Sequence, residues 1–285
     1  MKHFFLTTLL AFGFNHFVSA QSLPVPPPSP KQTVNQQFGT TSIEVIYSRP
    51  GLKGRKAFGD VVAYGKLWRT GANSATTIEF GENVTVNTTE VPKGKYGMVT
   101  IPNESEWEVI ITKDLNVTGD YNFKKENVVA RFPVKPEMLN DKVETFTIDI
   151  SDIQPQSAEV VIKWDMTMVR FSVKEDIDAK IMAAIEKDMK NDKRPFHTAA
   201  TYYFENGKDL KQALEWENKA LEANPSAYWI LTQKAKIQNA LKDYPAAMAT
   251  AQVAMEAAKK GDNDAYVKMN EALMAEINAN PAYKK

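Results

Sequence analysis

Cysteine is absent from the 285 residues of the chain, and histidine occurs only three times. The absence of cysteine excludes disulfides, thiol nucleophiles and zinc–thiolate sites. His3 and His16 lie within the first twenty residues, which leaves His197 as the only histidine in the rest of the chain. A metal site built from several histidines is therefore excluded there, and one imidazole base remains. We expect no metal and no cofactor, because the available chemistry is confined to carboxylates, Ser, Thr, Lys, Tyr and Arg.

The chain also lacks an excess of charge of either sign. It contains 35 Lys and Arg residues and 35 Asp and Glu residues. Lys2 is the only charged residue among the first twenty, so the remainder has 34 basic residues (35 − 1) and 35 acidic ones, a net charge of −1. This balance gives no indication of nucleic acid as a partner. No stretch after residue 20 approaches the roughly 18 apolar residues of a membrane span, so we expect none.

Residues 1–20 have the pattern of a secretory signal peptide. Lys2 gives the positive start, residues 4–14 are mostly apolar, and residues 18–20 (Val-Ser-Ala) form a small-residue cleavage site. The apolar stretch is too short to cross a bilayer. A buried N-terminal helix is the alternative interpretation. We expect cleavage near Ala20 and an exported protein, located in the periplasm or outside the cell.

Residues 21–30 form a proline-rich segment. Five of these ten residues are proline: Pro24, Pro26, Pro27, Pro28 and Pro30. Such a run is stiff, solvated and extended, so we interpret it as a linker. A ligand for a proline-binding partner is the alternative.

From residue 31 to residue 174 apolar residues recur with a period of two, which is typical of strands with one buried face. Trp107, Val109 and Ile111, for example, alternate with Glu106 and Glu108. Strands are expected near residues 43–47, 76–80, 84–87, 95–101, 106–112, 127–134, 143–150, 158–164 and 168–173. This spacing predicts an antiparallel β-sandwich over residues 31–174.

At about Asp176 the period becomes that of an α-helix, and residues 176–281 are expected to form an all-α domain. Within it, Lys208-Asp209-Leu210 recurs as Lys242-Asp243-Tyr244, at an offset of 34 residues (242 − 208). This is the period of tetratricopeptide (TPR) repeats. Four residues agree with that consensus: Phe204, Ala213, Ala220 and Pro225. We expect TPR-like helical repeats that hold a protein partner, with a capping helix over residues 264–279.

The segment from Tyr47 to Asn73 is the strongest candidate for a functional site. It is a connection of about 25 residues between two strands, and a compact domain rarely keeps so long a loop unless it binds something or is disordered. Its apolar residues need burial, which argues against disorder. Asp60 is its only acid, against six cations: Arg49, Lys53, Arg55, Lys56, Lys66 and Arg69. The expected ligand-binding residues are Tyr47, Arg49, Arg55, Tyr64, Trp68, Arg69 and Asn73.

Arginine forks recognise carboxylates, sulfates and phosphates, and adjacent aromatic rings favour sugars or planar ligands. We therefore expect an exported binding protein for a small anionic or carbohydrate-like ligand. Arg49, Arg55 and Arg69 are expected to converge on one pocket that has Trp68 or Tyr64 in its wall. The alternative is structural: the arginines pair with carboxylates of the sandwich and donate hydrogen bonds to loop carbonyls, and the aromatic residues close the end of its core.

A second functional class stays open. A metal-independent hydrolase or lyase would use Asp60 as a base and Lys66 or Tyr64 as an acid, with the arginines beside them. The sequence offers nothing that orients these groups, and Asp60 is more simply explained as the cap of a short turn over residues 61–64. The shortage of histidine and cysteine also favours binding over catalysis.

Several segments resemble an exported bacterial domain family of unknown function, DUF2911. They are Tyr47-Ser-Arg-Pro, Lys53-Gly-Arg-Lys, Phe58-Gly59, Tyr64-Gly-Lys-Leu-Trp-Arg-Thr-Gly-Ala-Asn73 and Lys95-Tyr-Gly-Met-Val-Thr-Ile-Pro102. The resemblance covers residues 31–173 and implies export, but it brings no established activity. Family members often carry tryptophan in the loop after the strand at 106–112, where this chain has Gly119-Asp120-Tyr121.

Overall fold

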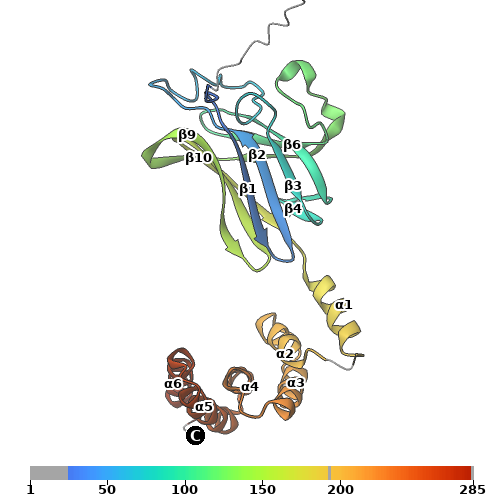
Figure 1. Ribbon diagram of the computed structural model, residues 1–285, viewed down its shortest axis with the longest axis vertical. Helices are drawn as coiled ribbons and strands as arrows, with labels where there is room; N and C mark the ends of the chain where they lie inside the picture. Colours follow the sequence, from blue (N-terminus) through green and yellow to red (C-terminus); the bar gives the residue numbers. More distant parts are fainter. Residues whose placement is uncertain (1–24, 192–193, 284–285) are drawn as a thin grey trace, which may run out of the picture. The chain divides into compact units, whose positions relative to one another are not determined.

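The chain divides into two compact units, Met1–Glu175 and Asp176–Lys285 (Figure 1). The computed structural model describes residues 25–191 and 194–283. The predicted signal peptide and the first four residues of the predicted linker lie outside the described residues. In the part of the chain that is described, no helix has the length and apolar character that crossing a membrane requires.

The first unit contains two antiparallel sheets. One has six strands in the order β1-β2-β3-β6-β7-β8, namely β1 (Lys31–Phe38), β2 (Thr41–Ser48), β3 (Thr77–Phe80), β6 (Gly94–Ile101), β7 (Trp107–Thr112) and β8 (Val128–Val134). The other has four strands in the order β5-β4-β10-β9, namely β4 (Val84–Val86), β5 (Thr89–Val91), β9 (Glu137–Gln154) and β10 (Ser157–Lys174). Two 3-10 turns precede β8: η1 (Asp120–Asn122) and η2 (Lys125–Asn127). The predicted antiparallel β-sandwich is confirmed.

Both sheets contribute to one apolar core. Strand β2 buries Ile43 and Val45 there, and β10 buries Ile162. The largest side chains in it are two indoles, Trp107 and Trp164, each 1% exposed. Replacing a tryptophan of this kind by alanine costs about 3–5 kcal/mol, so these rings account for much of the stability of the unit.

Apart from β9, which runs from Glu137 to Gln154 where a strand at 143–150 was expected, the strands differ from the prediction in three places. Strand β1 was not expected, because its sequence is mostly polar and buries only Phe38 fully. The short strand β5 was also missed. Strand β10 is continuous where two strands were expected, since its register with β9 shifts on both sides of Asp165 and these irregularities interrupt the alternation.

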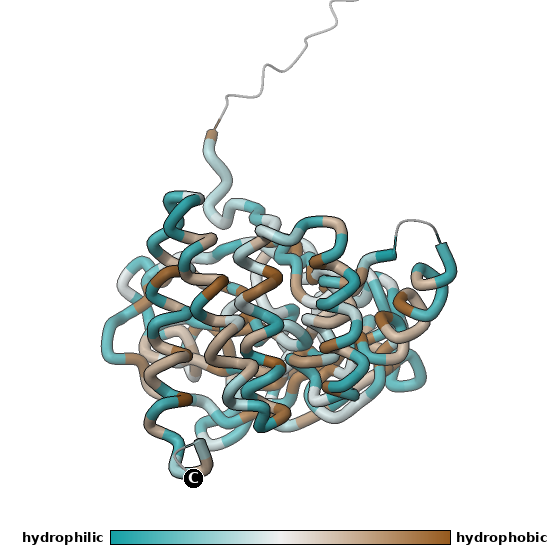
Figure 2. The backbone as a smooth tube through the Cα atoms, turned by 90° about the horizontal axis from the view of Figure 1, so that it is seen from below, coloured by the Kyte–Doolittle hydropathy of each residue, from teal (hydrophilic) through white to brown (hydrophobic). Residues whose placement is uncertain are grey.

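The second unit is helical, as predicted. Its helices are α1 (Asp178–Asp188), α2 (Phe196–Glu205), α3 (Leu210–Ala223), α4 (Tyr228–Ala240), α5 (Tyr244–Lys260) and α6 (Asp264–Ala279). Consecutive helices from α2 to α6 pack against one another. Polar and apolar segments alternate along the helices in Figure 2, as amphipathic helices require.

The 34-residue repeat of the sequence has a structural counterpart at two helix starts. Asp209 is the N-cap of α3, where its side chain accepts hydrogen bonds from the backbone N–H groups of Lys211 and Gln212. Asp243 is the N-cap of α5 and accepts from the N–H of Ala246. Both copies of the repeated sequence therefore lie at the start of the second helix of a helix pair, α2–α3 and α4–α5.

Candidate functional site

The candidate site is built on the connection between β2 and β3, an ordered loop that is bonded to both sheets. Its beginning is attached to β9: Leu52 N–H donates to Glu144 O at 3.0 Å, and Phe146 N–H donates to Pro50 O at 2.9 Å. Farther along, Trp68 and Thr100 of β6 exchange backbone hydrogen bonds of 2.7 and 2.9 Å. These attachments hold the loop across one end of the sandwich.

Tyr47 and Arg49 bind the backbone of β9. The Tyr47 hydroxyl accepts from Ile148 N–H at 2.9 Å and donates to Ile148 O at 3.0 Å. Burial raises the pKa of Tyr47, so the hydroxyl keeps its proton. The Arg49 guanidinium donates to Phe146 O, to the Thr147 hydroxyl and, at 2.6 Å, to Gln32 Oε1. Both side chains close the gap between the sheets, and neither lines a cavity described below.

Trp68 belongs to an aromatic cluster at the end of the core. Its ring stacks on Trp164 at 5.9 Å with an interplanar angle of 14°, and it makes edge contacts with Phe58, Trp107 and Phe146. Its indole N–H donates to Gly71 O at 3.0 Å. The aromatic part of the structural alternative is therefore correct for Trp68, although part of this ring also faces a cavity.

Asp165 is a site residue that the sequence did not single out. It lies at the irregular part of β10 with φ = 57°, a left-handed conformation that costs a non-glycine residue about 1–3 kcal/mol. Its carboxylate accepts the backbone N–H of Ala57 at 3.0 Å and lies 3.8 Å from Lys142 Nζ. Asp165 thus ties the loop to the sheet. The alternation of a strand marks this position only as polar, because a bulge leaves no signal of its own in the pattern.

Two cavities lie against the loop. The smaller, about 420 Å³, we call the Trp68 cavity, and its lining includes Val61, Lys66, Trp68, Arg69, Asn73 and Trp164. The larger, about 610 Å³, we call the Tyr64 cavity, and its lining includes Arg55, Lys56, Tyr64, Glu104, Lys142 and Asp165. Both volumes fall within the range of small-molecule sites, roughly 300–1,000 Å³.

The structure does not bring the three arginines into one pocket. Arg55 lines the Tyr64 cavity, Arg69 lines the Trp68 cavity and Arg49 is held by β9. The reason is the direction of the loop, which leaves β2 along the edge of β9 and then crosses the end of the sandwich. The expectation of a single three-arginine pocket is wrong.

The cations of the loop lack carboxylate partners. Among the described residues, no Asp or Glu oxygen lies within 4.0 Å of the charged nitrogens of the six loop cations, whereas Arg131 and Arg170 of the strands do form ion pairs. The arginines donate to neutral groups instead: Arg55 to the carbonyls of Leu52 and Gly51, and Arg69 to Asn73 O at 2.6 Å. The predicted pairing with sandwich carboxylates is therefore wrong, whereas the hydrogen bonds to loop carbonyls that the same alternative predicted are observed for Arg55 and Arg69.

The groups suggested for catalysis are not assembled. Asp60 is exposed and its carboxylate accepts the backbone N–H of Lys56 at 3.3 Å, so it caps the residues before it and not a turn over 61–64. Tyr64 and Lys66 line different cavities. In the part of the chain that the structure describes, no group of three His, Cys, Asp or Glu side chains is arranged to hold a metal ion.

Residues 29–173, which include the whole loop and both sheets except the last residue of β10, match a family model described as "Protein of unknown function (DUF2911)". The chain belongs to the DUF2911 family. The resemblance read from the loop segments is thereby confirmed over nearly the same residues. No curated protein and no solved structure matches the chain.

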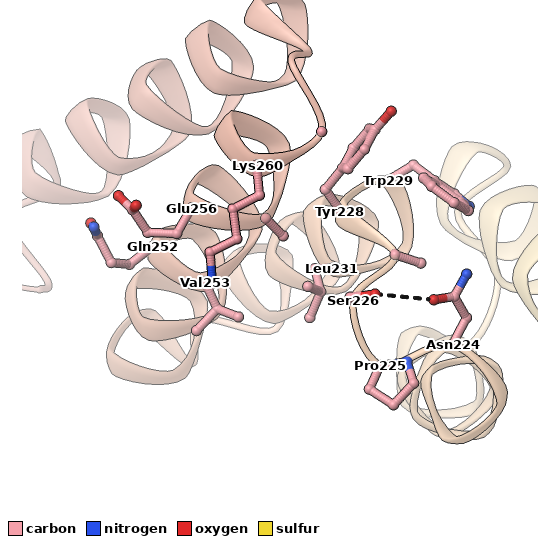
Figure 3. A pocket seen from close by; sticks show the side chains of 13 residues that line it. Asn224, Pro225, Ser226, Tyr228, Trp229, Leu231, Gln252, Val253, Glu256 and Lys260 are labelled. Carbon is pink, nitrogen blue, oxygen red and sulfur yellow. Dashed lines mark hydrogen bonds between the residues drawn. The ribbon is translucent and has the colours of Figure 1, made fainter.

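The helical unit lies beyond the part matched to DUF2911 and has a cavity of its own, of about 710 Å³. Figure 3 shows Tyr228 and Trp229 of α4 on one side of it and Val253 and Lys260 of α5 on the other. Trp229 is 39% exposed and Val253 is 55% exposed. The sequence predicted a protein partner for these helices but no particular residues, and the signal that was missed is an exposed tryptophan at a helix start.

Proposed function

We propose that the DUF2911 domain is a binding module for a small anionic, carbohydrate-like ligand, held by the loop between β2 and β3. The observation that carries this proposal is that the described loop cations have no carboxylate partner and that four of them, Arg55, Lys56, Lys66 and Arg69, line cavities with aromatic walls. An arginine whose other donors are free can bind a carboxylate or sulfate with two parallel hydrogen bonds.

The Trp68 cavity is the better primary site for the anion. Its lining includes Lys66 and Arg69 and contains no acid. The bond from Arg69 Nη1 to Asn73 O orients the guanidinium and leaves its other nitrogens available. Trp68 supplies an apolar surface for a sugar ring, and Asn73, whose amide already donates to Ser29 O at 3.1 Å, completes the lining.

Two parts of the proposal concern the rest of the protein. The helical unit acts as a TPR-like scaffold for a protein partner, which the repeated helix caps and the exposed Trp229 support. Capture of a partner should be lost in Trp229→Ala.

The protein is exported after cleavage near Ala20. N-terminal sequencing of the native protein should therefore begin at Gln21, and an intact Met1 would contradict this.

Thermal unfolding tests the anion site. For the chain from Gln21 onward, sodium glucuronate or sulfate should raise Tm relative to sodium chloride of the same ionic strength, by roughly 5–10 °C at a hundred-fold excess over Kd. Lys66→Ala/Arg69→Ala should abolish the rise while changing Tm without ligand only slightly, because neither cation has an ion pair to lose and Arg69 loses one hydrogen bond, to Asn73 O.

Lys174→Ala is the matched control. Lys174 is an exposed cation nine residues along β10 from Asp165, about 30 Å away at 3.3 Å per residue. A rise that persists in the double variant would overturn the site. Cleavage of a glycan during incubation would instead favour the hydrolase or lyase alternative.

A further inference from the structure

We propose that the ligand is an acidic oligosaccharide of two or more sugar units, which occupies the Trp68 cavity and the Tyr64 cavity at the same time. This inference rests on the proposed function and adds the size and chemical class of the ligand.

The two cavities have no lining residue in common, but they are neighbours, since Phe58 of the Tyr64 cavity contacts Trp68 of the other cavity edge to face at 5.9 Å. Ala63 lines the Trp68 cavity and the next residue, Tyr64, lines the other. On β10, Trp164 lines the Trp68 cavity and the next residue, Asp165, lines the Tyr64 cavity. The bond from Ala57 N–H to Asp165 fixes the loop between them. Adjacent residues thus line the two cavities at two independent places, and this closeness is the basis for proposing that one ligand occupies both.

Free positive charge is present in each cavity. The Trp68 cavity has Lys66 and Arg69 and no acid. The Tyr64 cavity has three cations and three acids along its lining: Arg55, Lys56, Lys142, Glu104, Glu137 and Asp165.

Two of those three acids are already engaged. Arg170 donates to both oxygens of Glu137 at 2.7 and 2.8 Å, which holds the pKa of that carboxyl below its ordinary value. Asp165 is paired with Lys142. Of the charged residues in the lining, Arg55, Lys56 and Glu104 then remain without an ion pair. The net charge of these three residues is +1 (2 − 1).

Each cavity also has aromatic residues in its lining, Trp68 and Trp164 in the Trp68 cavity and Phe58 and Tyr64 in the Tyr64 cavity. Trp68 is supported by its stack on Trp164. The Tyr64 ring lies against Gly59, where a Cβ would be 3.1 Å from the ring and where φ is 88°, a conformation that favours glycine. The repeated combination of aromatic rings and nearby cations fits a polymer whose units each carry a sugar ring and an anionic group. A single inorganic anion would leave the Tyr64 cavity empty and would use neither Trp68 nor Tyr64 as a contact.

Calorimetry with defined oligosaccharides tests the proposal. The probes are galacturonate, di- and tetragalacturonate, a heparin-derived tetrasaccharide, and neutral maltotetraose as the charge control, all at one ionic strength. The affinity should rise by roughly ten-fold or more once a second unit is present, because the second contact becomes intramolecular. This applies to di- and tetragalacturonate relative to galacturonate, and to the sulfated tetrasaccharide relative to sulfate.

The variants separate the cavities. Arg55→Ala and Tyr64→Ala should remove the gain from length and leave the affinity for galacturonate unchanged, whereas Arg69→Ala should weaken every acidic probe. Lys174→Ala should change neither. Circular dichroism and Tm of each variant verify that it is folded, and since Arg55 is exposed its replacement is readily accommodated.

The outcomes separate this inference from the proposed function. Equal affinity for galacturonate and tetragalacturonate, together with equal affinity for sulfate and the sulfated tetrasaccharide, would overturn the two-cavity ligand and leave the anion site standing. Binding of maltotetraose as tight as that of the acidic probes would overturn the role of charge. No binding of any acidic probe would overturn both proposals.

Discussion

At the scale of single residues, the Tyr47 side chain supplies the hydrogen bonds that a neighbouring strand would otherwise make with the backbone of β9. Strand β9 is at the edge of its sheet, and the N–H and C=O of Ile148 there both find their partner in one phenolic oxygen. The ring itself is 2% exposed and contacts Phe146 edge to face at 5.7 Å. Water does not reach these groups readily, so the hydroxyl is needed where it is.

Tyr47→Phe tests this role. The change keeps the ring and removes only the oxygen, which leaves two buried backbone groups of Ile148 without a partner. The free energy of unfolding should fall by roughly 1–3 kcal/mol in urea denaturation. Tyr121→Phe, at a side chain that is 84% exposed, is the control and should have little effect. Equal stability of Tyr47→Phe and the wild type would show that the hydroxyl is not structural.

The loop residues show which features of the site can be predicted from the sequence and which cannot. The surplus of cations over acids in the loop predicted unpaired positive charge, and for all six cations that surplus is observed among the described residues. Composition does not say which side of a loop a residue faces. Arg49 and Arg55 are only six positions apart, yet one faces β9 and the other a cavity. Asp165 could not be found, because its importance comes from a backbone conformation and not from its neighbours in sequence.

At the scale of elements, the pair α2–α3 is joined by a buried polar contact. The two helices approach closely through small residues, including Ala200 and Ala213, both fully buried. Between them, His197 Nδ1 lies 3.0 and 3.1 Å from the two carboxylate oxygens of Glu217, whose side chain is 0% exposed. Burial raises the pKa of Glu217, and the hydrogen bond from His197 opposes that shift only in part.

The contact predicts a specific pH dependence. A carboxyl whose pKa is raised in the folded state favours folding fully below its ordinary pKa of 4.5 and loses that contribution as pH rises through the folded pKa. Glu217→Gln has no such loss, because the amide is neutral throughout. The unfolding free energy of the variant minus that of the wild type should therefore increase from pH 4.5 upward and level off above the folded pKa.

Urea denaturation between pH 4 and pH 8 measures this difference. Glu222→Gln, at an exposed position on the same helix α3, is the control and should give a flat difference. A difference for Glu217→Gln that is flat or that decreases with pH would contradict the assignment.

The secondary-structure elements themselves were largely predictable from the sequence. Strong alternation identified the core strands, and the helical period identified the second unit. The polar edge strand β1 gave too weak a signal.

At the scale of the whole molecule, the two units have separate cores. The apolar cluster of the sandwich contains only residues from Phe38 to Val173, and the helical clusters begin at Ala200. The change of period near Asp176 coincides with the boundary between Glu175 and Asp176. A boundary of this kind is visible in sequence because each type of core imposes its own periodicity on every residue that faces it.

Fragments should therefore fold by themselves. Residues 25–175 should give a sheet-type far-UV circular dichroism spectrum and residues 176–285 a helical one, and each should unfold cooperatively. Their sum should reproduce the spectrum of the chain from residue 25 onward. An unfolded 25–175 fragment would mean that the sandwich depends on the helices, and an unfolded 176–285 fragment the reverse.

The attachment of the loop to β9 has a consequence for solubility. Strand β9 is 18 residues long, and an uncovered edge of that length is a template on which another copy of the chain can add a strand. Pro50, Leu52 and two side chains occupy that edge around residues 144–148. A cut in the loop or the loss of Arg49 is therefore expected to produce self-association through β9 at temperatures where the core is still intact.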